Sequence, residues 1–342
     1  MRAPGFWRQG AHSVWPDLLA PIAILYDAAV QRTYRTTVRE DAPMPVICIG
    51  NFVSGGAGKT PTAIALSLLL AARGHKPGFL SRGYGGRLTG PLLVDRDSHT
   101  TGDVGDEPLL LVRHAPTIVS ASRPAGARFA ADHGINVLIM DDGLQNNSLA
   151  KAFSLAVVDA AYGIGNGRPV PSGPLRGSMA FQLGLADAIL LIGKGHAAAD
   201  VEQMAGERDI PVFRAQLENG DLDKLNGREC IAYAGIGRPE KFFDSLKAAG
   251  IRLIAAVPFA DHHPFTQGDA RRLLDQARKS HAQLLTTEKD FARLAGTTGD
   301  LALLAQASRA VAVELVFDDA ETLLTLIEAR ISAQNQSAGP AR

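Results

Sequence analysis

The stretch PVICIGNFVSGGAGKTPTAIALSLLLAARG, residues 45–74, decides the fold of this 342-residue chain. It begins with a short apolar run rich in β-branched residues, 45–50, which predicts a buried strand. A glycine-rich loop follows, and then an apolar stretch, 61–74, which predicts a helix that ends at Gly74. Strand, glycine loop and helix in this order are typical of a phosphate-binding loop, because backbone N–H groups and the helix N-terminus attract an anion.

The loop itself reads SGGAGKT over residues 54–60. The usual pattern G-x-x-x-x-G-K-[ST] has glycine where this chain has Val53. The adjacent glycines resemble a variant loop that often carries lysine where this chain has Ser54. We predict that Lys59 reaches the β- and γ-phosphates of a nucleotide and that the Thr60 hydroxyl holds Mg²⁺. The residues predicted to bind the nucleotide are Ser54, Gly55, Gly56, Ala57, Gly58, Lys59 and Thr60. A glycine-rich turn that binds no phosphate is the alternative.

Apolar runs and helical patterns alternate after this loop. The predicted strands are 78–81, 92–95, 117–120, 135–140, 154–159 and 187–192, and the predicted helices are 106–114 and 123–133. This alternation predicts an α/β fold of the P-loop NTPase type, with a mostly parallel sheet and helices on both faces.

A second series of elements predicts a smaller α/β domain. Its predicted strands are 229–234, 252–257, 283–287 and 310–317, and its predicted helices are 238–249, 267–279 and 320–332. The polar stretch 205–225 predicts the join between the two series. We therefore expect an N-terminal helical segment (1–40), a P-loop core (41–215), the smaller domain (216–332) and a disordered tail (333–342).

The N-terminal residues 14–30, VWPDLLAPIAILYDAAV, are apolar but interrupted by prolines and aspartates. Trp7 and Trp15 lie at the edge of this segment, and arginines flank it. Such a composition is typical of a helix that lies in a bilayer interface, and an amphipathic helix docked on its own domain is the alternative. No apolar run of about 18 residues is uninterrupted, so we expect no membrane-spanning helix. No small-residue cleavage site follows an apolar core, so we expect no secretory signal.

Composition excludes some classes of function. Lys plus Arg and Asp plus Glu both number 35, so the chain lacks the basic excess of a nucleic-acid-binding protein. The two cysteines, Cys48 and Cys230, are far apart and lack a partner motif, so we expect neither a disulfide nor a cysteine metal site. Cys48 lies in an apolar run and is predicted to be buried.

Three acidic or histidine motifs are candidates for chemistry. Asp141 and Asp142 follow the predicted strand 135–140, and an acid at this edge of a P-loop sheet binds Mg²⁺ directly or through water. The acids of GDVGDEP (102–108) precede a helix, where capping the helix is the simplest interpretation. The histidines of FADHHPF (259–265) indicate a general base or a loop without a role.

Seven motifs occur in one order over residues 15–330: GN-x-x-x-GG-x-GKTP, SRGYGG, GDEP, DDG-x-Q, GPLR, DHH and TTEKD. This ordered set resembles the tetraacyldisaccharide 4'-kinase family. The resemblance implies ATP-dependent phosphorylation, with Mg²⁺, of the 4'-hydroxyl of tetraacyldisaccharide 1-phosphate in lipid A biosynthesis. It also implies two α/β domains with the active site between them, and an N-terminal helix on the cytoplasmic face of the inner membrane. We expect the glycolipid and that membrane surface as partners, and no nucleic acid or obligatory protein partner.

The resemblance also assigns roles to individual residues. Asp106 and His262 match the catalytic acid–histidine pair, and we favour His262 over His263 because it directly follows Asp261. Asp141, Asp142 and Gln145 match the metal and nucleotide-side cluster, and Arg176 and Arg123 match phosphate-side arginines. One position departs: the family often reads GPLRE, and this chain has Gly177 in place of the glutamate. An acidic contact to Mg²⁺ or substrate is therefore missing or comes from elsewhere.

Other classes of protein use the same kind of loop. An ATP-dependent ligase and a GTPase-type metallochaperone are the rival enzymes, and a membrane-associated nucleotide switch is the rival outside enzymes. A GTPase needs an N-K-x-D base-reading motif, which this sequence lacks. A metallochaperone needs a Cys or His cluster, for which only His262 and His263 are available.

Overall fold

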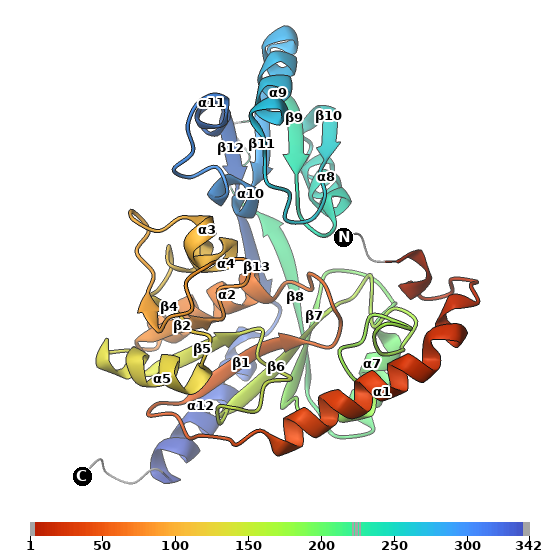
Figure 1. Cartoon of the computed structure of the whole chain (residues 1–342), viewed down its shortest axis with the longest axis vertical. Helices are drawn as coiled ribbons and strands as arrows, with labels where there is room; N and C mark the ends of the chain where they lie inside the picture. The colour runs from red at the N-terminus through yellow and green to blue at the C-terminus, as the bar shows by residue number, and fades with distance from the viewer. Residues whose placement is uncertain (1–3, 221, 223–224, 226, 338–342) are drawn as a thin grey trace.

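The computed structural model describes residues 4–220, 222, 225 and 227–337. Figure 1 shows a large unit built on one sheet and a smaller unit that stands on one edge of it. The large sheet has the order β13-β8-β7-β6-β1-β5-β2-β4-β3. Its strands are β1 (Val46–Asn51), β2 (Pro77–Ser81), β3 (Leu92–Leu93), β4 (Thr117–Val119), β5 (Val137–Asp141), β6 (Phe153–Asp159), β7 (Ala188–Ile192), β8 (Val212–Asn219) and β13 (Val313–Phe317).

The large sheet is mostly parallel, as predicted. Strand β1 lies between β5 and β6 and is parallel to both, and every one of its residues is buried. The edge strands β3 and β13 are antiparallel to their neighbours. The helices of this unit are α2 (Lys59–Ala72), α3 (Thr101–Val104), α4 (Asp106–Leu111), α5 (Arg123–Asp132), α6 (Met179–Leu183), α7 (Ala199–Gly206) and α12 (Ala320–Ser337).

Helices cover both faces of the large sheet because its central strands are apolar on both sides. Val46 and Cys48 of β1 belong to a hydrophobic cluster that includes residues of α5 and α7. Ile47 and Ile49, the alternate residues, belong to a second cluster that includes residues of α2 and α12. Both cysteines of the chain are free and buried, so the prediction for Cys48 is confirmed.

The smaller unit has a four-stranded parallel sheet of the order β10-β9-β11-β12. Its strands are β9 (Glu229–Ala234), β10 (Arg252–Pro258), β11 (Gln283–Thr287) and β12 (Ser308–Val311), and its helices are α8 (Pro239–Ala248), α9 (Gln267–Ser280), α10 (Glu288–Ala292) and α11 (Asp300–Ala307). The N-terminal residues form a short 3₁₀ helix, η1 (Gly5–Trp7), and the long helix α1 (Trp15–Thr36), which runs along the large unit in Figure 1.

The chain leaves the large unit at Gly220, within the predicted join 205–225, but that stretch also holds a strand that was not predicted. This strand, β8, pairs with β7 although its residues alternate between buried and exposed, as expected of a strand near a sheet edge. The predicted strand 310–317 is two strands, because the chain leaves the small sheet after Val311 and β13 joins β8 of the large sheet. The range 216–332 therefore does not form one unit: the end of β8, β13 and α12 belong to the large unit.

The predicted tail is partly wrong as well. Helix α12 continues to Ser337, so residues 333–337 are helical rather than disordered. The rest of the predicted tail, 338–342, lies outside the described residues.

Candidate functional site

The loop between β1 and α2 lies at the carboxyl edge of the large sheet. Gly58 caps α2 with a φ of 96°, and a Cβ atom there would lie 2.6 Å from Cδ1 of Ile192, so only glycine fits. Val53, which stands where the usual motif has glycine, pairs with Leu175 in an antiparallel bridge. The Ser54 amide donates to the carbonyl of Pro174 at 2.8 Å. The loop is thus anchored to the segment that carries Arg176.

Asp141 ends β5 at this edge, where its side chain is buried. Among the described residues, neither of its carboxylate oxygens has a hydrogen-bond partner. Burial and the nearby charge of Glu107 raise the pKa of Asp141 to about 7. A buried carboxylate without a partner is costly unless a cation or a donor completes the site.

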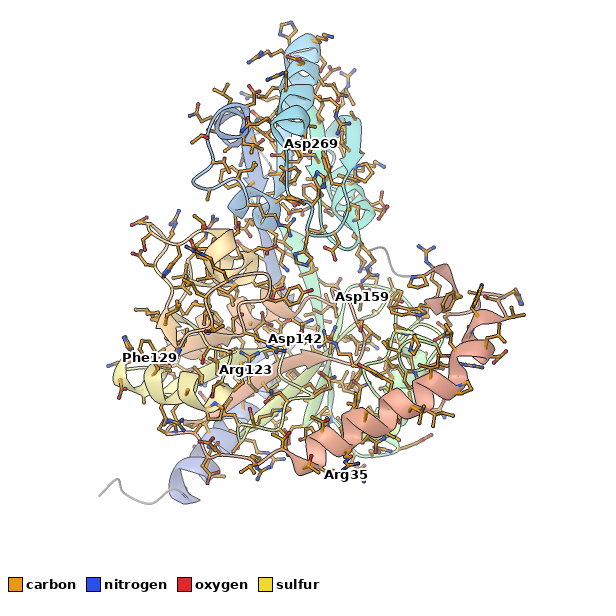
Figure 2. The ribbon with its side chains drawn as sticks, viewed as in Figure 1. Arg35, Arg123, Phe129, Asp142, Asp159 and Asp269 are labelled. Atoms are coloured by element: carbon orange, nitrogen blue, oxygen red, sulfur yellow. The ribbon has the colours of Figure 1, made fainter. Side chains whose placement is uncertain are left out.

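Asp142, the next residue, is held by two cations. Arg176 donates to its two carboxylate oxygens at 2.8 and 3.0 Å, and Nζ of Lys59 lies 3.7 Å from Oδ1. Burial alone would raise the pKa of Asp142, but Lys59 and Arg176 hold it below its usual range. Figure 2 shows Asp142 on the edge of the sheet that faces the smaller unit.

The acids at this edge fit Mg²⁺. No group of three or more His, Cys, Asp or Glu side chains suited to a metal occurs in the described part of the chain. Mg²⁺ does not need one, since it is usually bound by one or two carboxylates together with substrate phosphates and water. Asp141 offers two free oxygens for this purpose, and Thr60 lies in the first turn of α2.

Gln145 is placed beside the loop, but its amide nitrogen is already used. It donates to the carbonyl of Asn51 at 2.8 Å and to Oε1 of Gln182 at 2.6 Å. Gln182 in turn donates to the carbonyls of Phe52 and Gly177. Gln145 thus supports the start of the loop, and its role as a metal ligand stays a prediction. No sequence motif points to Gln182, because its contacts are buried and most of them join residues far apart in the chain.

Arg123 is buried at the start of α5, and its guanidinium donates to the carbonyls of Leu80 and Asp141, both at 3.3 Å. Burial lowers the pKa of Arg123. Arg123 therefore joins the ends of β2 and β5 through their backbone carbonyls, and its positive charge lies near both aspartates. A direct contact between Arg123 and a nucleotide stays a prediction.

Asp106 and His262 come together across the two units. Nδ1 of His262 lies 3.1 Å from Oδ2 of Asp106. Arg293, which the sequence did not single out, donates to the same oxygen through Nε at 2.9 Å. Burial alone would raise the pKa of Asp106, but His262 and Arg293 lower it well below its usual range. The hydrogen bond with Asp106 raises the pKa of His262.

The second histidine, His263, points elsewhere. Its Nε2 atom lies 3.0 Å from Asp269, the residue that closes the capping box of α9, and its ring stacks on Phe259 with the centroids 4.8 Å apart. It therefore belongs to the packing of the smaller unit. His262 is the histidine that the structure brings to Asp106, and its role as the functional histidine stays a prediction.

Glu107 and Lys289 make a second contact between the units, at 2.7 Å. Burial opposes both charges, yet the pair lowers the pKa of Glu107 and raises that of Lys289. Lys289 lies in the motif TTEKD and Glu107 in the motif GDEP. This ion pair therefore brings together two motifs that are far apart in the sequence.

Helix α1 presents a row of apolar side chains to solvent. Leu18, Ile22 and Leu25 are 64%, 54% and 71% exposed. The opposite side of the helix is held by Asp27, which accepts the Ser178 amide at 2.7 Å, two residues from Arg176. No helix in the described part of the chain is long and apolar enough to cross a membrane. Exposed apolar side chains gathered on one helix face are typical of an interaction surface.

Comparisons with known proteins show which family the chain belongs to. The family model described as tetraacyldisaccharide-1-P 4'-kinase matches residues 15–332. The chain is 46% identical over 340 residues to the tetraacyldisaccharide 4'-kinase of Bradyrhizobium sp. (strain ORS 278), covering 98% of this chain and 100% of the relative. It is 52% identical over 296 residues to the enzyme of that name from Methylobacterium nodulans, covering 86% and 88% of the two chains.

A solved structure has the same fold. The crystal structure of LpxK from Aquifex aeolicus, described as an "apo" form in complex with ATP, matches with a TM-score of 0.71 and 26% sequence identity. The match covers 92% of this chain and 99% of that one. Since the family model spans nearly the whole chain and the match covers 88% or more of both relatives, the chain belongs to the tetraacyldisaccharide-1-P 4'-kinase family.

Proposed function

We propose that this protein transfers the γ-phosphoryl group of ATP to the 4'-hydroxyl of tetraacyldisaccharide 1-phosphate. One observation carries the proposal: His262 and Asp106, which we assign as a general base and its partner, lie 3.1 Å apart and join the two units at the edge of the sheet that holds loop 54–60 and Asp141. A nucleotide switch without an acceptor does not need such a base. The Aquifex aeolicus relative, whose structure contains ATP, supports ATP as the nucleotide.

The loop residues 54–60 would hold the phosphates of ATP through backbone N–H groups, with Lys59 at the β- and γ-phosphates. Asp141 and Thr60 would hold Mg²⁺, which when bound neutralises charge on the phosphates. Arg176 and Lys59 fix Asp142 beside this position. Because phosphoryl transfer has a loose transition state, positioning and neutralisation of charge contribute more than the base does.

His262 would accept the proton of the 4'-hydroxyl as that oxygen attacks the γ-phosphorus. Its Nδ1 atom faces Asp106, so the carboxylate stabilises the imidazolium that forms. Its Nε2 atom, 3.8 Å from Oδ1 of Asp261, would face the substrate. Arg293 holds Asp106 in place by a donor at 2.9 Å. The raised pKa of His262 makes the ring a stronger base.

The exposed row on α1, defined by Leu18, Ile22 and Leu25, would lie in the bilayer interface. Acyl chains of the substrate would stay in the lipid while its sugar head enters the site. The family assignment supports the cytoplasmic face of the inner membrane as the place of action.

A direct assay tests the activity. The full chain is incubated with γ-labelled ATP, Mg²⁺ and the disaccharide 1-phosphate lipid in mixed micelles, and the lipid is extracted. We expect label in a bis-phosphorylated lipid. Label released only as inorganic phosphate, at a rate that the lipid does not change, would contradict the proposal.

A further inference from the structure

Arg238 of the smaller unit contacts the phosphate-binding loop of the large unit directly. Its Nη2 atom donates to the carbonyl of Gly56, in the middle of that loop, at 3.3 Å. The same guanidinium forms an ion pair with Asp159, at the end of β6, and lies over the ring of Tyr162 at 5.2 Å from its centroid. Figure 2 shows Asp159 at the edge of the sheet below the smaller unit. None of the motifs considered above includes Arg238.

A second cation shares the same carboxylate. Lys241, in the first turn of α8, also forms an ion pair with Asp159. Two positive charges thus face one negative charge beside a loop built for a phosphate anion. Burial and the nearby charge of Arg238 lower the pKa of Lys241 to about 8, as expected where cations crowd together without a second anion.

Both cations remain accessible to a ligand. The side chain of Asp159 is 7% exposed, whereas those of Arg238 and Lys241 are 34% and 46% exposed. The carboxylate is also fixed, because it accepts the Ala161 amide at 3.0 Å. The acid therefore stays at the end of β6, while the two longer side chains are able to turn toward an anion in the loop.

We propose that Arg238 and Lys241 are nucleotide-binding residues that the smaller unit contributes, and that they bind the phosphate tail of the nucleotide held by loop 54–60. Asp159 holds them beside the loop until the nucleotide arrives. This inference rests on the proposed function, since it takes the loop to be a nucleotide site. It adds a pair of cations to Lys59 and Arg176, from the opposite side of the site.

A different role would give different results. If Arg238 only fastened the smaller unit to the large one, Asp159→Asn would harm nucleotide binding as much as Arg238→Gln does. Under the proposal the two changes act in opposite directions: Asp159→Asn keeps an acceptor for the Ala161 amide but releases both cations to the phosphates, whereas Arg238→Gln removes a ligand of the phosphates.

The test uses isothermal titration calorimetry of the full chain with a non-hydrolysable ATP analogue and, by competition, adenosine. We expect Arg238→Gln and Lys241→Gln each to weaken binding of the analogue about tenfold, the size of one charge-assisted hydrogen bond. Binding of adenosine should not change. Arg238→Lys should keep most of the affinity, and Asp159→Asn should equal or exceed the wild type. Lys247→Gln, on the exposed side of α8, is the matched control.

Two outcomes would overturn the inference alone. One is an unchanged dissociation constant for the analogue in Arg238→Gln and Lys241→Gln. The other is equal weakening in Asp159→Asn and Arg238→Gln. The proposed function stands in both cases if the wild type binds the analogue and Lys59→Ala does not. A wild-type protein that binds no analogue would overturn the inference and the proposed function together.

Discussion

The imidazole of His262 and the carboxylate of Asp106 lie 3.1 Å apart although 156 positions separate them in the chain. Each comes from a different unit, so the pair exists only while the units are in contact. Arg293 donates to the same carboxylate and to the carbonyl of Gly235, which also accepts the His262 amide at 3.0 Å, so these contacts link Asp106 to the backbone beside His262.

The first prediction concerns this pair. His262→Ala and Asp106→Asn should each lower kcat by roughly 10²–10⁴-fold, because each removes the general base or its partner. His263→Gln is the matched control, since that residue contacts Asp269 and not Asp106. Turnover is measured with labelled ATP and the lipid acceptor. Unchanged turnover in both Asp106→Asn and His262→Ala would rule out the pair as the base.

The pH dependence of the reaction should report on the same contact. The pKa of His262 is raised above its usual value near 6.5, mainly by the hydrogen bond with Asp106. The neutral ring is the base, so kcat should rise with pH through this raised pKa. Asp106→Asn removes the negative charge, lowers the pKa and should move the rise to lower pH, with a lower plateau. A rise at the same pH in both proteins would contradict this assignment.

Asp141 should lower stability in the absence of metal. The pKa of Asp141 is about 7 in the folded protein, above the usual 3.8. The unfolded chain therefore loses this proton at a lower pH than the folded protein does, and the free energy of unfolding falls as pH rises from about 4 to about 7. The loss is of the order of 4 kcal/mol by linkage. Denaturant unfolding at pH 4.5 and pH 8 should show a smaller loss in Asp141→Asn than in the wild type, and equal losses would contradict the prediction.

The same variant should bind Mg²⁺ poorly. Asp141→Asn removes the carboxylate charge that would hold the ion, so the Mg²⁺ concentration for half-maximal activity should rise about tenfold or more, with the loss partly reversed by excess Mg²⁺. Glu40→Gln, which alters a surface ion pair with Arg128, should leave the Mg²⁺ requirement unchanged.

Arg293 should also matter for the fold of the smaller unit. Its side chain is 9% exposed and pairs with Asp290, which is fully buried, at 2.6 Å. Arg293→Ala leaves that carboxylate without its cation and should destabilise the smaller unit by about 3–5 kcal/mol. Arg271→Ala, which breaks an exposed pair with Asp300, should cost about 1 kcal/mol or less. Denaturant unfolding of both variants measures these losses. Equal losses would contradict the prediction that the buried ion pair contributes more stability than the exposed one.

We expect the exposed row on α1 to bind lipid membranes. Replacing Leu18, Ile22 and Leu25 together by serine should release the protein from sedimenting lipid vesicles and leave binding of the ATP analogue intact, because these side chains face solvent. Leu303→Ser, at an exposed apolar position of the smaller unit, is the control. Undiminished sedimentation of the triple variant would exclude this surface. A deletion of α1 is less suitable, since Asp27 holds the segment that follows Arg176.

The sequence predicted those parts of the fold that repeat a local pattern. The strand, loop and helix of residues 45–74 and the long helices α5, α8 and α9 were found because propensity and packing agree there. Strand β8 was missed because it is half-exposed and polar. The exchange of sheets after Val311 could not be predicted, since nothing local distinguishes a strand that joins one sheet from a strand that joins another.

The same limit applies to the site. Lys59, Thr60 and the two aspartates follow from a motif whose geometry is local. The roles of Asp106 and His262 are predicted from the family resemblance. Without it, Asp106 is interpreted as a helix-capping acid and His262 as a loop histidine. Arg293, Gln182 and Arg238 had no signal, since their partners lie far away in the chain.

The smaller unit is joined to the large one by two connections that lie side by side. The chain leaves β8 at Gly220 and returns to β13 at Ala312, and the Gly220 amide donates to the Ala312 carbonyl at 2.9 Å. The smaller unit is therefore inserted at a single edge of the large sheet, between β8 and β13. For the same reason, truncation after Val311 would remove β13 and α12 from the core of the large unit and leave all four strands of the smaller unit in place.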